Sequence, residues 1–301
     1  MDLTNVHLIT HAGCMDGSTC AVLFTAAGGK RENIHFTNPL HVNVEDMLTD
    51  LLSLGVRVIL ADVSVSLEYA REMRAVDSVY LLDHHVGATP LAAFEWCSIE
   101  IDNMRCGSKM LFDWLLRTTF DADRGNFRLY KELVDVADDY DRWVRDIPES
   151  ETIANLHYLL GPKLFVDRFI KNPDIQLNVQ EAYALNLEAL KKEDYVSRAK
   201  RRAVVRTIEI DGTPVRVGFT MADNYQSEVG HAIYEDLQLN VQVAVMVSGN
   251  KISLRGDGTV DLSKVAALNG GGGHSTAAGC NQAKVLGREL LDLVMDKMKW
   301  E

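Results

Sequence analysis

Two patterns of apolar residues alternate along the first half of the chain. Short continuous apolar runs are typical of strands buried on both faces, and such runs lie at Val6–Thr10, Ile34–Phe36, Val56–Ala61 and Val79–Leu82. Apolar residues spaced three or four apart are typical of amphipathic helices, and this spacing occurs at Ser18–Ala27, Val44–Leu54 and Leu67–Arg74. Strands that alternate with helices in this way predict a mainly parallel sheet with helices on both faces.

The middle of the chain is predicted to be helical. Ser108 is expected to cap a helix that runs to Leu115, and a second helix places its apolar residues on one face at Leu133, Val136, Ala137 and Tyr140. The charged stretch Val179–Arg206 contains neither glycine nor proline. It predicts a long helix that connects two domains, and we assign residues 179–204 to this linker.

After residue 205 the pattern predicts hairpins. Asp211-Gly212 separates two β-branched runs and Gly249-Asn250 separates two more, and both pairs favour the positive φ angles of tight turns. A final helix is expected to place Leu286, Leu290, Leu293 and Val294 on one face. The expected fold class is therefore α/β: a parallel-sheet domain over residues 1–178, the linker helix, and a smaller α+β domain over residues 205–301.

Composition and charge narrow the possible partners. The 301 residues are 47% apolar and 25% charged, which is typical of a soluble globular chain with room for two domains. With 31 basic and 43 acidic residues the net charge is −12, which argues against a protein that coats long nucleic acid or an anionic membrane. No apolar run approaches the roughly 20 residues of a membrane span, and no signal-peptide pattern is present. The five scattered cysteines form no zinc-type pair, which favours the reducing cytoplasm.

Acidic and histidine residues follow the ends of three predicted strands. His11 and Asp16 follow the first strand, Asp62 follows another, and Asp83-His84-His85 follows the next. Taken alone, His11 is more simply a solvent-facing residue and Asp62 a helix cap. Because the carboxyl ends of parallel strands meet at one edge of a sheet, the whole set is instead expected to converge in one crevice. Clustered carboxylates and imidazoles suit divalent ions such as Mn²⁺ or Mg²⁺.

These residues resemble the first three motifs of the DHH phosphoesterase superfamily. The tail carries an independent match to the DHH-associated domain that follows in many members, at Ser253-Leu254-Arg255, Val260-Asp261, Gly270-Gly271-Gly272-Gly273-His274 and Ala277-Ala278-Gly279. The two matches cover essentially the whole chain. The glycine–histidine run is the more specific of them, since Asp-His-His is only three residues. The resemblance implies a parallel-sheet catalytic domain that faces a smaller domain across a cleft.

The resemblance also implies a site for two divalent ions, with Mn²⁺ favoured over Mg²⁺. His11 is expected to bind one ion, Asp16 and His84 the other, and Asp62 to bridge both. A fourth motif lies in Val136–Asp141. If Val-Ala-Asp is the motif it selects Asp138, whereas Asp-x-Asp-x-Trp selects Asp139 and Asp141, and we favour Asp139.

Two residues of this region have alternative roles. The sequence departs from the family pattern at Cys14, near the position where the first aspartate is expected. Cys14 is either a thiolate ligand, which softens the site toward iron or zinc, or a small packing residue. His85 is expected to be catalytic, by stabilising the transition state or protonating the leaving group. The alternative is that His85 holds the metal ligands in place.

In the second domain, candidate substrate-binding residues surround the glycine run. Glycines let backbone amides approach an anion closely, and His274 adds a hydrogen bond or a positive charge, so we expect a phosphate cradle at Gly271, Gly272 and Gly273. Arg255, beside Ser253, is expected to bind a phosphate or stack on a base. Asn224, Gln226 and Ser227 precede an amphipathic helix and are expected to cap it.

The leading hypothesis is a metal-dependent phosphodiesterase that hydrolyses very short oligonucleotides, or linear dinucleotides such as pGpG, to mononucleotides. The resemblance implies attack by a hydroxide held between two ions. The acidic charge favours short substrates, because a processive nuclease needs a basic channel. One alternative is an exopolyphosphatase or pyrophosphatase, although few cations lie near the motifs, mainly Arg105, Arg142 and Arg255. An alternative of another class is a nucleotide-binding sensor with a decayed metal site. We expect a short phosphorylated nucleotide as the partner, and neither long duplex nor membrane.

Overall fold

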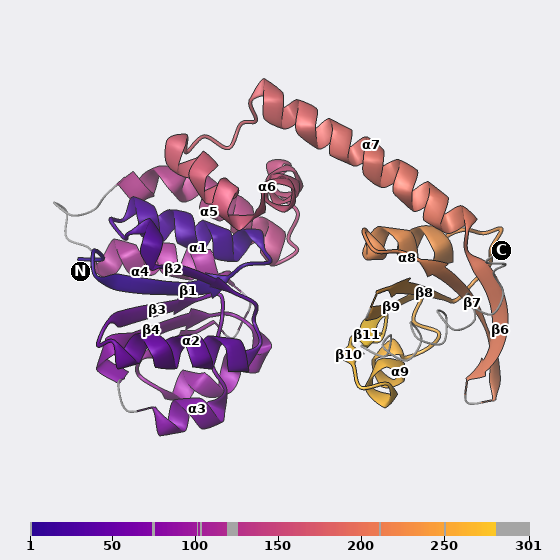
Figure 1. Cartoon of the computed structure of the whole chain (residues 1–301), viewed down its shortest axis with the longest axis horizontal. Coiled ribbons are helices and arrows are strands. Elements are labelled where there is room, and N and C mark those ends of the chain that lie inside the picture. The colour runs from indigo at the N-terminus through magenta and orange to yellow at the C-terminus, as the bar shows by residue number, and fades with distance from the viewer. Residues whose placement is uncertain are drawn as a thin grey trace, which may run out of the picture. The chain divides into compact units, whose positions relative to one another are not determined.

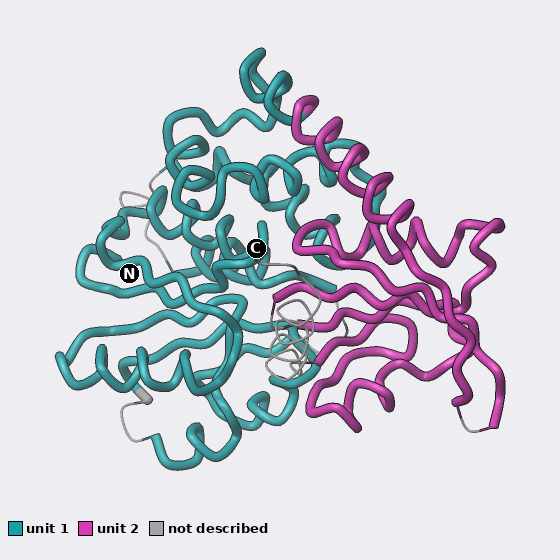
Figure 2. Tube along the Cα trace, turned by 45° about the vertical axis from the view of Figure 1, so that its right-hand side comes forward, with its two compact units in different colours: residues 1–185 teal, residues 186–301 magenta. Residues whose placement is uncertain are grey.

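The computed structural model describes residues 2–73, 76–100, 102, 104–118, 126–210, 212–249 and 251–280. It divides the chain into two compact units, residues 1–185 and 186–301 (Figure 2). The helix expected at Leu286–Val294 lies outside the described residues. The assignment of a catalytic role to residues 1–178 and a substrate-binding role to residues 205–301 stays a prediction.

A five-stranded parallel sheet forms the centre of the first unit, in the order β2-β1-β3-β4-β5. The strands are β1 (Val6–His11), β2 (Ile34–Thr37), β3 (Arg57–Ala61), β4 (Val79–Asp83) and β5 (Cys97–Ile99). Strand β2 lies on one side of β1 and β3 on the other, so the order in which the chain adds strands reverses between β1 and β3. Loops that leave the carboxyl ends of two such strands diverge to opposite faces and leave a crevice between them.

Helices cover both faces of this sheet, as predicted (Figure 1). One face carries α1 (Met15–Ala26), α4 (Gly107–Thr118), α5 (Lys131–Asp141) and α6 (Glu149–Lys171), and the other carries α2 (His41–Ser53) and α3 (Leu67–Glu72). Leu8 belongs to the first core, with Phe24, and its neighbour Ile9 to the second, with Leu48. Successive side chains of a strand point to opposite faces, so consecutive apolar residues fill two cores. Each of these fully buried side chains contributes about 1.5–3 kcal/mol of apolar burial.

The structure corrects two element boundaries. Ser108 was expected to cap a helix, but α4 already begins at Gly107, and the backbone N–H of Ser108 donates to a side chain of α1 instead. The linker helix α7 spans Val179–Arg201 and stops short of residue 204. It ends there because Val204–Ile210 pairs with the next strand along its whole length, and β-branched residues favour that pairing over another helical turn. Helix α6, which is interrupted at Gly161, was not foreseen.

The second unit is built on a six-stranded sheet in the order β10-β11-β9-β8-β7-β6, in which only β7 and β8 are parallel. Its strands are β6 (Val204–Ile210), β7 (Thr213–Met221), β8 (Val243–Ser248), β9 (Lys251–Gly256), β10 (Gly272–Gly273) and β11 (Ala277–Cys280). The two predicted hairpins are β6–β7 and β8–β9. Helix α8 (Gln226–Tyr234) belongs to the apolar cluster on one face and α9 (Leu262–Leu268) to that on the other. The predicted α/β class is therefore confirmed.

Among the residues that the structure describes, no helix is both long enough and apolar enough to cross a lipid bilayer.

Candidate metal centre

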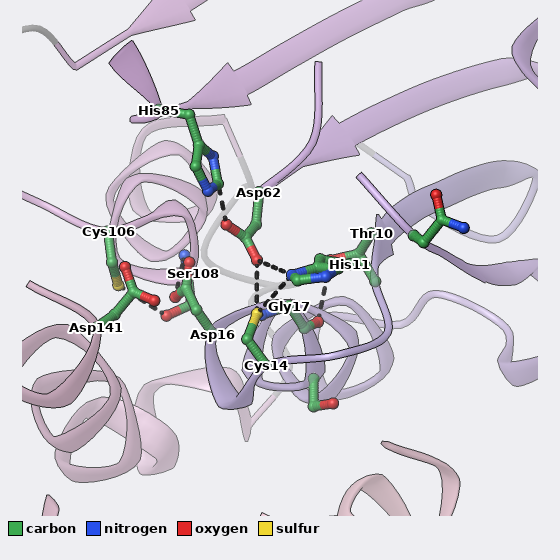
Figure 3. A network of polar contacts seen from close by, with 12 residues as sticks. Thr10, His11, Cys14, Asp16, Gly17, Asp62, His85, Cys106, Ser108 and Asp141 are labelled. Atoms are coloured by element: carbon green, nitrogen blue, oxygen red, sulfur yellow. Dashed lines mark hydrogen bonds and ion pairs between the residues drawn. The ribbon is translucent and has the colours of Figure 1, made fainter. Parts of the chain in front are cut away.

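The polar residues that follow β1, β3 and β4 converge at the reversal point of the first sheet (Figure 3). His11 ends β1, and its Nδ1 lies 3.8 Å from Oδ2 of Asp62, which follows β3. On the other side of Asp62, Oδ1 lies 3.3 Å from Nε2 of His84, which follows β4. The crevice expected from the sequence is therefore present, and Asp62 is at its centre.

The start of α1 contributes two further potential metal ligands, Cys14 and Asp16. Cys14 is the N-cap of the helix, and its Sγ accepts a hydrogen bond from the backbone N–H of Gly17 at 3.2 Å. A Cβ at Gly17 would overlap the carbonyl oxygen of His11, so only glycine lets the helix start this close to β1. Thr10 Oγ1 donates to the carbonyl of Gly17 at 3.0 Å and ties the two segments together.

Asp16 is buried with one oxygen unsatisfied. Its Oδ1 accepts from the backbone N–H of Ser108 at 2.9 Å, whereas Oδ2 has no hydrogen-bond partner among the described residues. The carboxylate is only 1% exposed. An ionised oxygen in such a place costs several kcal/mol unless a cation approaches it. The first residue of α4, Gly107, leaves room here, since a Cβ on it would lie 2.9 Å from Asp16 Oδ2 and 2.8 Å from the Cβ of Asp62.

Asp62 is strained and destabilised in its ionised form. Its φ of 62° lies in the left-handed region, which aspartate tolerates better than most residues but still at a cost of about 1 kcal/mol or more. Burial and the nearby charge of Asp16 raise the pKa of Asp62 to about 8. Strain and a shifted pKa at one buried carboxylate are typical of a functional site.

His84 faces three carboxylates. Its Nε2 lies 3.3 Å from Asp62 Oδ1, 3.3 Å from Asp141 Oδ2 and 3.9 Å from Asp16 Oδ2. Burial lowers the pKa of His84, but the hydrogen bond with Asp62 and the charges of Asp16 and Asp141 outweigh burial and raise the pKa to about 9. Burial and the charge of Asp16 also raise the pKa of Asp141, to about 6. The positive charge of the protonated His84 ring thus partly neutralises the three carboxylates, as a divalent ion bound to them would.

His85 points beside the cluster and is oriented by Asp83. The ring Nδ1 lies 2.7 Å from Asp83 Oδ1, and that same oxygen accepts from the backbone N–H groups of His84 and His85. The hydrogen bond with Asp83 raises the pKa of His85 to about 9. The side chain of His85 is 50% exposed, whereas that of Asp83 is 1% exposed. Asp83 therefore fixes the orientation of the His85 ring, and His85 is the more exposed of the two side chains.

The structure places the three candidates for the fourth acidic position differently, and the choice among them stays a prediction. We favoured Asp139, but its Oδ1 accepts from the backbone N–H groups of Asp146 and Ile147. Asp138 instead binds the N–H of Cys106 at 2.8 Å and the cations of Lys109 and Arg142, each at 2.9 Å. The carboxylate that reaches the cluster is Asp141, which the Asp-x-Asp-x-Trp alternative had selected.

Within the part of the chain that the structure describes, three groups have donor atoms that lie within 4.8 Å of one another: His11, Cys14 and Asp62; Asp16, His84 and Asp141; and Asp62 with Asp83, His84 and His85. The first two groups are separate donor sets, and Asp62 contacts members of both. Nitrogen, oxygen and sulfur donors at this spacing suit divalent metal ions. The unsatisfied Asp16 Oδ2 and the raised pKa of Asp62 both indicate an excess of negative charge in the cluster. Bound metal ions would neutralise this charge.

The loop after α5 was not recognised from the sequence as part of this region. Trp143 and Arg145 have φ angles of 61° and 64°, which non-glycine residues seldom adopt. The guanidinium of Arg145 lies 3.9 Å from the ring centroid of Trp143 and 4.0 Å from that of Tyr140. The Trp143 side chain is 72% exposed, two residues beyond Asp141. The tryptophan of the Asp-x-Asp-x-Trp pattern is the signal in the sequence that points to this loop.

In the second unit, Arg255 and Ser253 lie on β9 against the start of α8. Arg255 Nη2 donates to Ser227 Oγ at 2.8 Å, and Ser253 Oγ donates to Gln226 Oε1 at 2.6 Å. Capping was expected of Asn224, Gln226 and Ser227, and this is wrong: α8 begins after Tyr225 with no side-chain cap. The side chains of Gln226 and Ser227 instead hold the β9 residues in place.

The glycine run closes against β11. Gly272 and Gly273 form β10, which pairs with Gly279 and Ala278. A Cβ at Gly271 would overlap the carbonyl of Gly279, so the strands approach each other only because a side chain is missing. His274 is exposed at the turn between the strands. The requirement for glycine at 271 therefore has a structural cause, while the phosphate cradle stays a prediction.

The described residues of the second unit line hollows on either side of Lys251. One, of about 140 Å³, is lined by Lys251, Ile252, Ser253, Gly270, Gly271, Gly279 and Cys280, and so contains two of the predicted substrate-binding residues. The other, of about 550 Å³, is lined by Asp223, Asn224, Tyr225, Gln226, Ser248, Gly249 and Lys251. The Lys251 side chain belongs to both, and it is the cation among their lining residues.

Two solved structures share the fold at low sequence identity. The pGpG-specific phosphodiesterase PggH from Vibrio cholerae matches with a TM-score of 0.52 at 13% identity, over 97% of this chain and 100% of that chain. The exonuclease RecJ bound to manganese matches with a TM-score of 0.51 at 15% identity, over 96% of this chain and 88% of that chain. The resemblance carried by the motifs is thereby confirmed at the level of fold: the chain has the fold of the DHH superfamily.

The chain is also similar in sequence to the oligoribonuclease NrnB of Bacillus subtilis (strain 168). The identity is 27% over 294 residues, which cover 91% of this chain and 72% of NrnB. No family model matches the chain. NrnB, PggH and RecJ are all named as enzymes that cleave phosphodiester bonds, and the RecJ structure contains manganese.

Proposed function

We propose that this protein is a metal-dependent phosphodiesterase that hydrolyses very short oligonucleotides or linear dinucleotides to mononucleotides. The observation that carries the proposal is the convergence of His11, Asp16, Asp62, His84 and Asp141 at the reversal point of a parallel sheet. The similarity to NrnB and PggH, which are named for short oligoribonucleotides and pGpG, supports the choice of substrate.

Two divalent ions, with Mn²⁺ as the first candidate, fit the donor sets. His11 and Cys14 would hold one ion, Asp16, His84 and Asp141 the other, and Asp62 would contact both. When bound, such ions supply Lewis acidity toward the phosphate and acidify the water that attacks phosphorus. The protonated His84 ring and the proton on Asp62 offset the same negative charge of the carboxylates that a metal ion would offset. We therefore expect metal binding to release protons.

The protein's own residues would orient the reaction. Asp83 holds the His85 ring through Nδ1, which leaves Nε2 as the nitrogen available for a substrate group. A protonated His85 at this place can donate to the leaving oxygen or to a non-bridging oxygen of the phosphate. The strained turn at Asp62 fixes its two oxygens toward opposite sides, one facing His11 and the other His84.

Trp143 is our candidate for a surface on which a base stacks. Its indole is 72% exposed, Arg145 holds it from one side, and the loop follows directly on Asp141. Stacking of a base on an aromatic side chain contributes about 1–3 kcal/mol and tolerates any base. In the second unit, Ser253 and Arg255 remain the candidates for binding a terminal phosphate, because their side chains are held in place by α8.

Purified protein offered pGpG, short RNAs of increasing length, and polyphosphate side by side tests this proposal. We expect Mn²⁺-dependent release of mononucleotides from pGpG and the shortest RNAs, loss of that activity in His84→Ala, and its retention in His35→Ala, which removes a histidine of β2 that belongs to none of the donor groups. Preferential release of phosphate from polyphosphate would instead identify an exopolyphosphatase. Binding of nucleotides without turnover under any metal would identify a sensor.

A further inference from the structure

The donor set around His11 differs from its neighbour by containing sulfur. Cys14 Sγ lies 3.1 Å from His11 Nδ1 and 2.9 Å from Asp62 Oδ2 (Figure 3). With the 3.8 Å between His11 and Asp62, the three atoms form a triangle of nitrogen, sulfur and oxygen donors. The neighbouring set, Asp16 Oδ2, His84 Nε2 and Asp141 Oδ2, contains only oxygen and nitrogen.

The position of the Cys14 sulfur is fixed by the backbone. The residue caps α1, and the N–H of Gly17 points at its Sγ. The loop lies close against the end of β1, because Gly17 packs directly on the carbonyl of His11 and a Cβ at Gly13 would already lie 3.0 Å from His11 Nε2. A cysteine used only for packing is expected among apolar side chains, as the fully buried Cys20 is. Cys14 instead contacts an imidazole and a carboxylate.

Sulfur changes which ion such a site selects. Thiolate ligands favour Fe²⁺, Co²⁺ and Zn²⁺, whereas carboxylate-rich sites without sulfur suit Mn²⁺ and Mg²⁺. Asp16 Oδ2 is buried and has no hydrogen-bond partner among the described residues, with His84 Nε2 3.9 Å away, and it points to a cation in the neighbouring set as well. The two sets therefore differ in the class of ion they prefer, although they share Asp62.

We propose that the His11–Cys14–Asp62 set is a thiolate site for Fe²⁺, Co²⁺ or Zn²⁺, beside a second site of the Mn²⁺ and Mg²⁺ class at Asp16, His84 and Asp141. On binding, a bond forms between the ion and the Cys14 sulfur, and the thiol proton passes to solvent. This inference rests on the proposed function in assuming that the cluster binds metal. It adds that the two ions are chemically unlike.

Cobalt is the probe, because a thiolate bound to Co²⁺ gives a charge-transfer band in the near ultraviolet. Chelator-treated full-length protein is titrated anaerobically with Co²⁺, and zinc affinity is measured by competition with a chromophoric chelator. We expect the band in the wild-type protein and in Cys97→Ser, a control thiol on β5 outside the donor sets. The band should be absent in both Cys14→Ser and Cys14→Asp. Zinc affinity should fall by at least about tenfold in Cys14→Ser, since loss of even an outer-shell partner of a metal ligand costs that much.

Each outcome decides the inference. Cobalt binding without the band, a band that survives in both Cys14 variants, or no cobalt binding at all would overturn it. Circular dichroism establishes that each variant is folded, and Cys14→Asp retains a ligand of the kind expected in the family. The proposed function is judged separately by hydrolysis of pGpG, measured with Mn²⁺ alone and with Mn²⁺ together with Co²⁺ or Zn²⁺. Wild-type protein that hydrolyses pGpG but shows no band contradicts only the thiolate site. A band without hydrolysis under either condition contradicts only the proposed function.

Discussion

Replacing Asp62 with asparagine should stabilise the metal-free protein while removing its metal site. Asp62 is 1% exposed, and its pKa in the folded state is about 8 against an ordinary value of 3.8. The folded protein therefore binds a proton at this position that the unfolded chain has lost, so the stability falls as the pH rises from about 4 to about 8. Asparagine has no such proton and removes the pH-dependent cost.

The magnitude follows from the two pKa values. At about pH 7 the carboxyl is roughly three pH units above its unfolded pKa and still protonated in the folded state, which at 1.36 kcal/mol per unit corresponds to a cost of up to about 4 kcal/mol. For a unit of 185 residues, each kcal/mol shifts the melting temperature by about 2–4 °C. Metal-free Asp62→Asn should thus melt about 8–16 °C above the wild type near neutral pH, and at about the same temperature near pH 4.

Chelator-treated proteins are compared by thermal denaturation, followed by circular dichroism across this pH range, and again with added Mn²⁺. Asp83→Asn is the matched control, and we expect it to destabilise the protein near neutral pH, where Asp62→Asn stabilises it. Burial raises the pKa of Asp83, but its hydrogen bond with His85 outweighs burial and lowers it, so its stabilisation is present above the unfolded pKa and is lost at low pH. Asp83→Asn should therefore lower the free energy of unfolding by about 1.5–3 kcal/mol near neutral pH. An Asp62→Asn protein no more stable than the wild type, or a gain that does not change with pH, would refute the reasoning.

Four further predictions, two of them with a control substitution, test separate parts of the protein. His85→Ala should lower kcat for pGpG by about 10²–10⁴-fold with little change in KM, measured by steady-state kinetics over a range of pH; an unchanged kcat excludes a catalytic role. Gly107→Ala brings a Cβ within 2.9 Å of Asp16 Oδ2 and should weaken Mn²⁺ binding at least about tenfold by calorimetry. Trp143→Ala should raise KM for pGpG by about 5- to 150-fold and leave kcat unchanged, while Trp143→Phe retains most of the affinity. Gly271→Ala should destabilise the second unit by about 1–3 kcal/mol, whereas Gly272→Ala, with open space at its Cβ, should melt like the wild type.

The sequence by itself determined four of the five strands of the parallel sheet, all but β5, and the approximate place of the candidate site. Strand β3 and strand β4 are visible as apolar runs because both faces of a parallel sheet are buried, and each run ends on a polar residue because the strand emerges there at the sheet edge. The motifs at His11, Asp62 and Asp83–His85 lie in these loops, so their convergence follows from parallel-strand geometry alone.

Only the tertiary structure decided which of the neighbouring acidic residues along one helix faces the cluster of polar side chains. Asp138, Asp139 and Asp141 fall within about one turn of α5. The sequence motif is compatible with each of them as the fourth acidic residue of the cluster. The choice depends on distant segments: the N–H of Cys106 and the Lys109 cation occupy Asp138, the loop at Asp146 occupies Asp139, and Asp141 is left facing His84. A local sequence pattern encodes backbone periodicity, whereas the partner of a buried carboxylate is set by chain segments that meet only on folding.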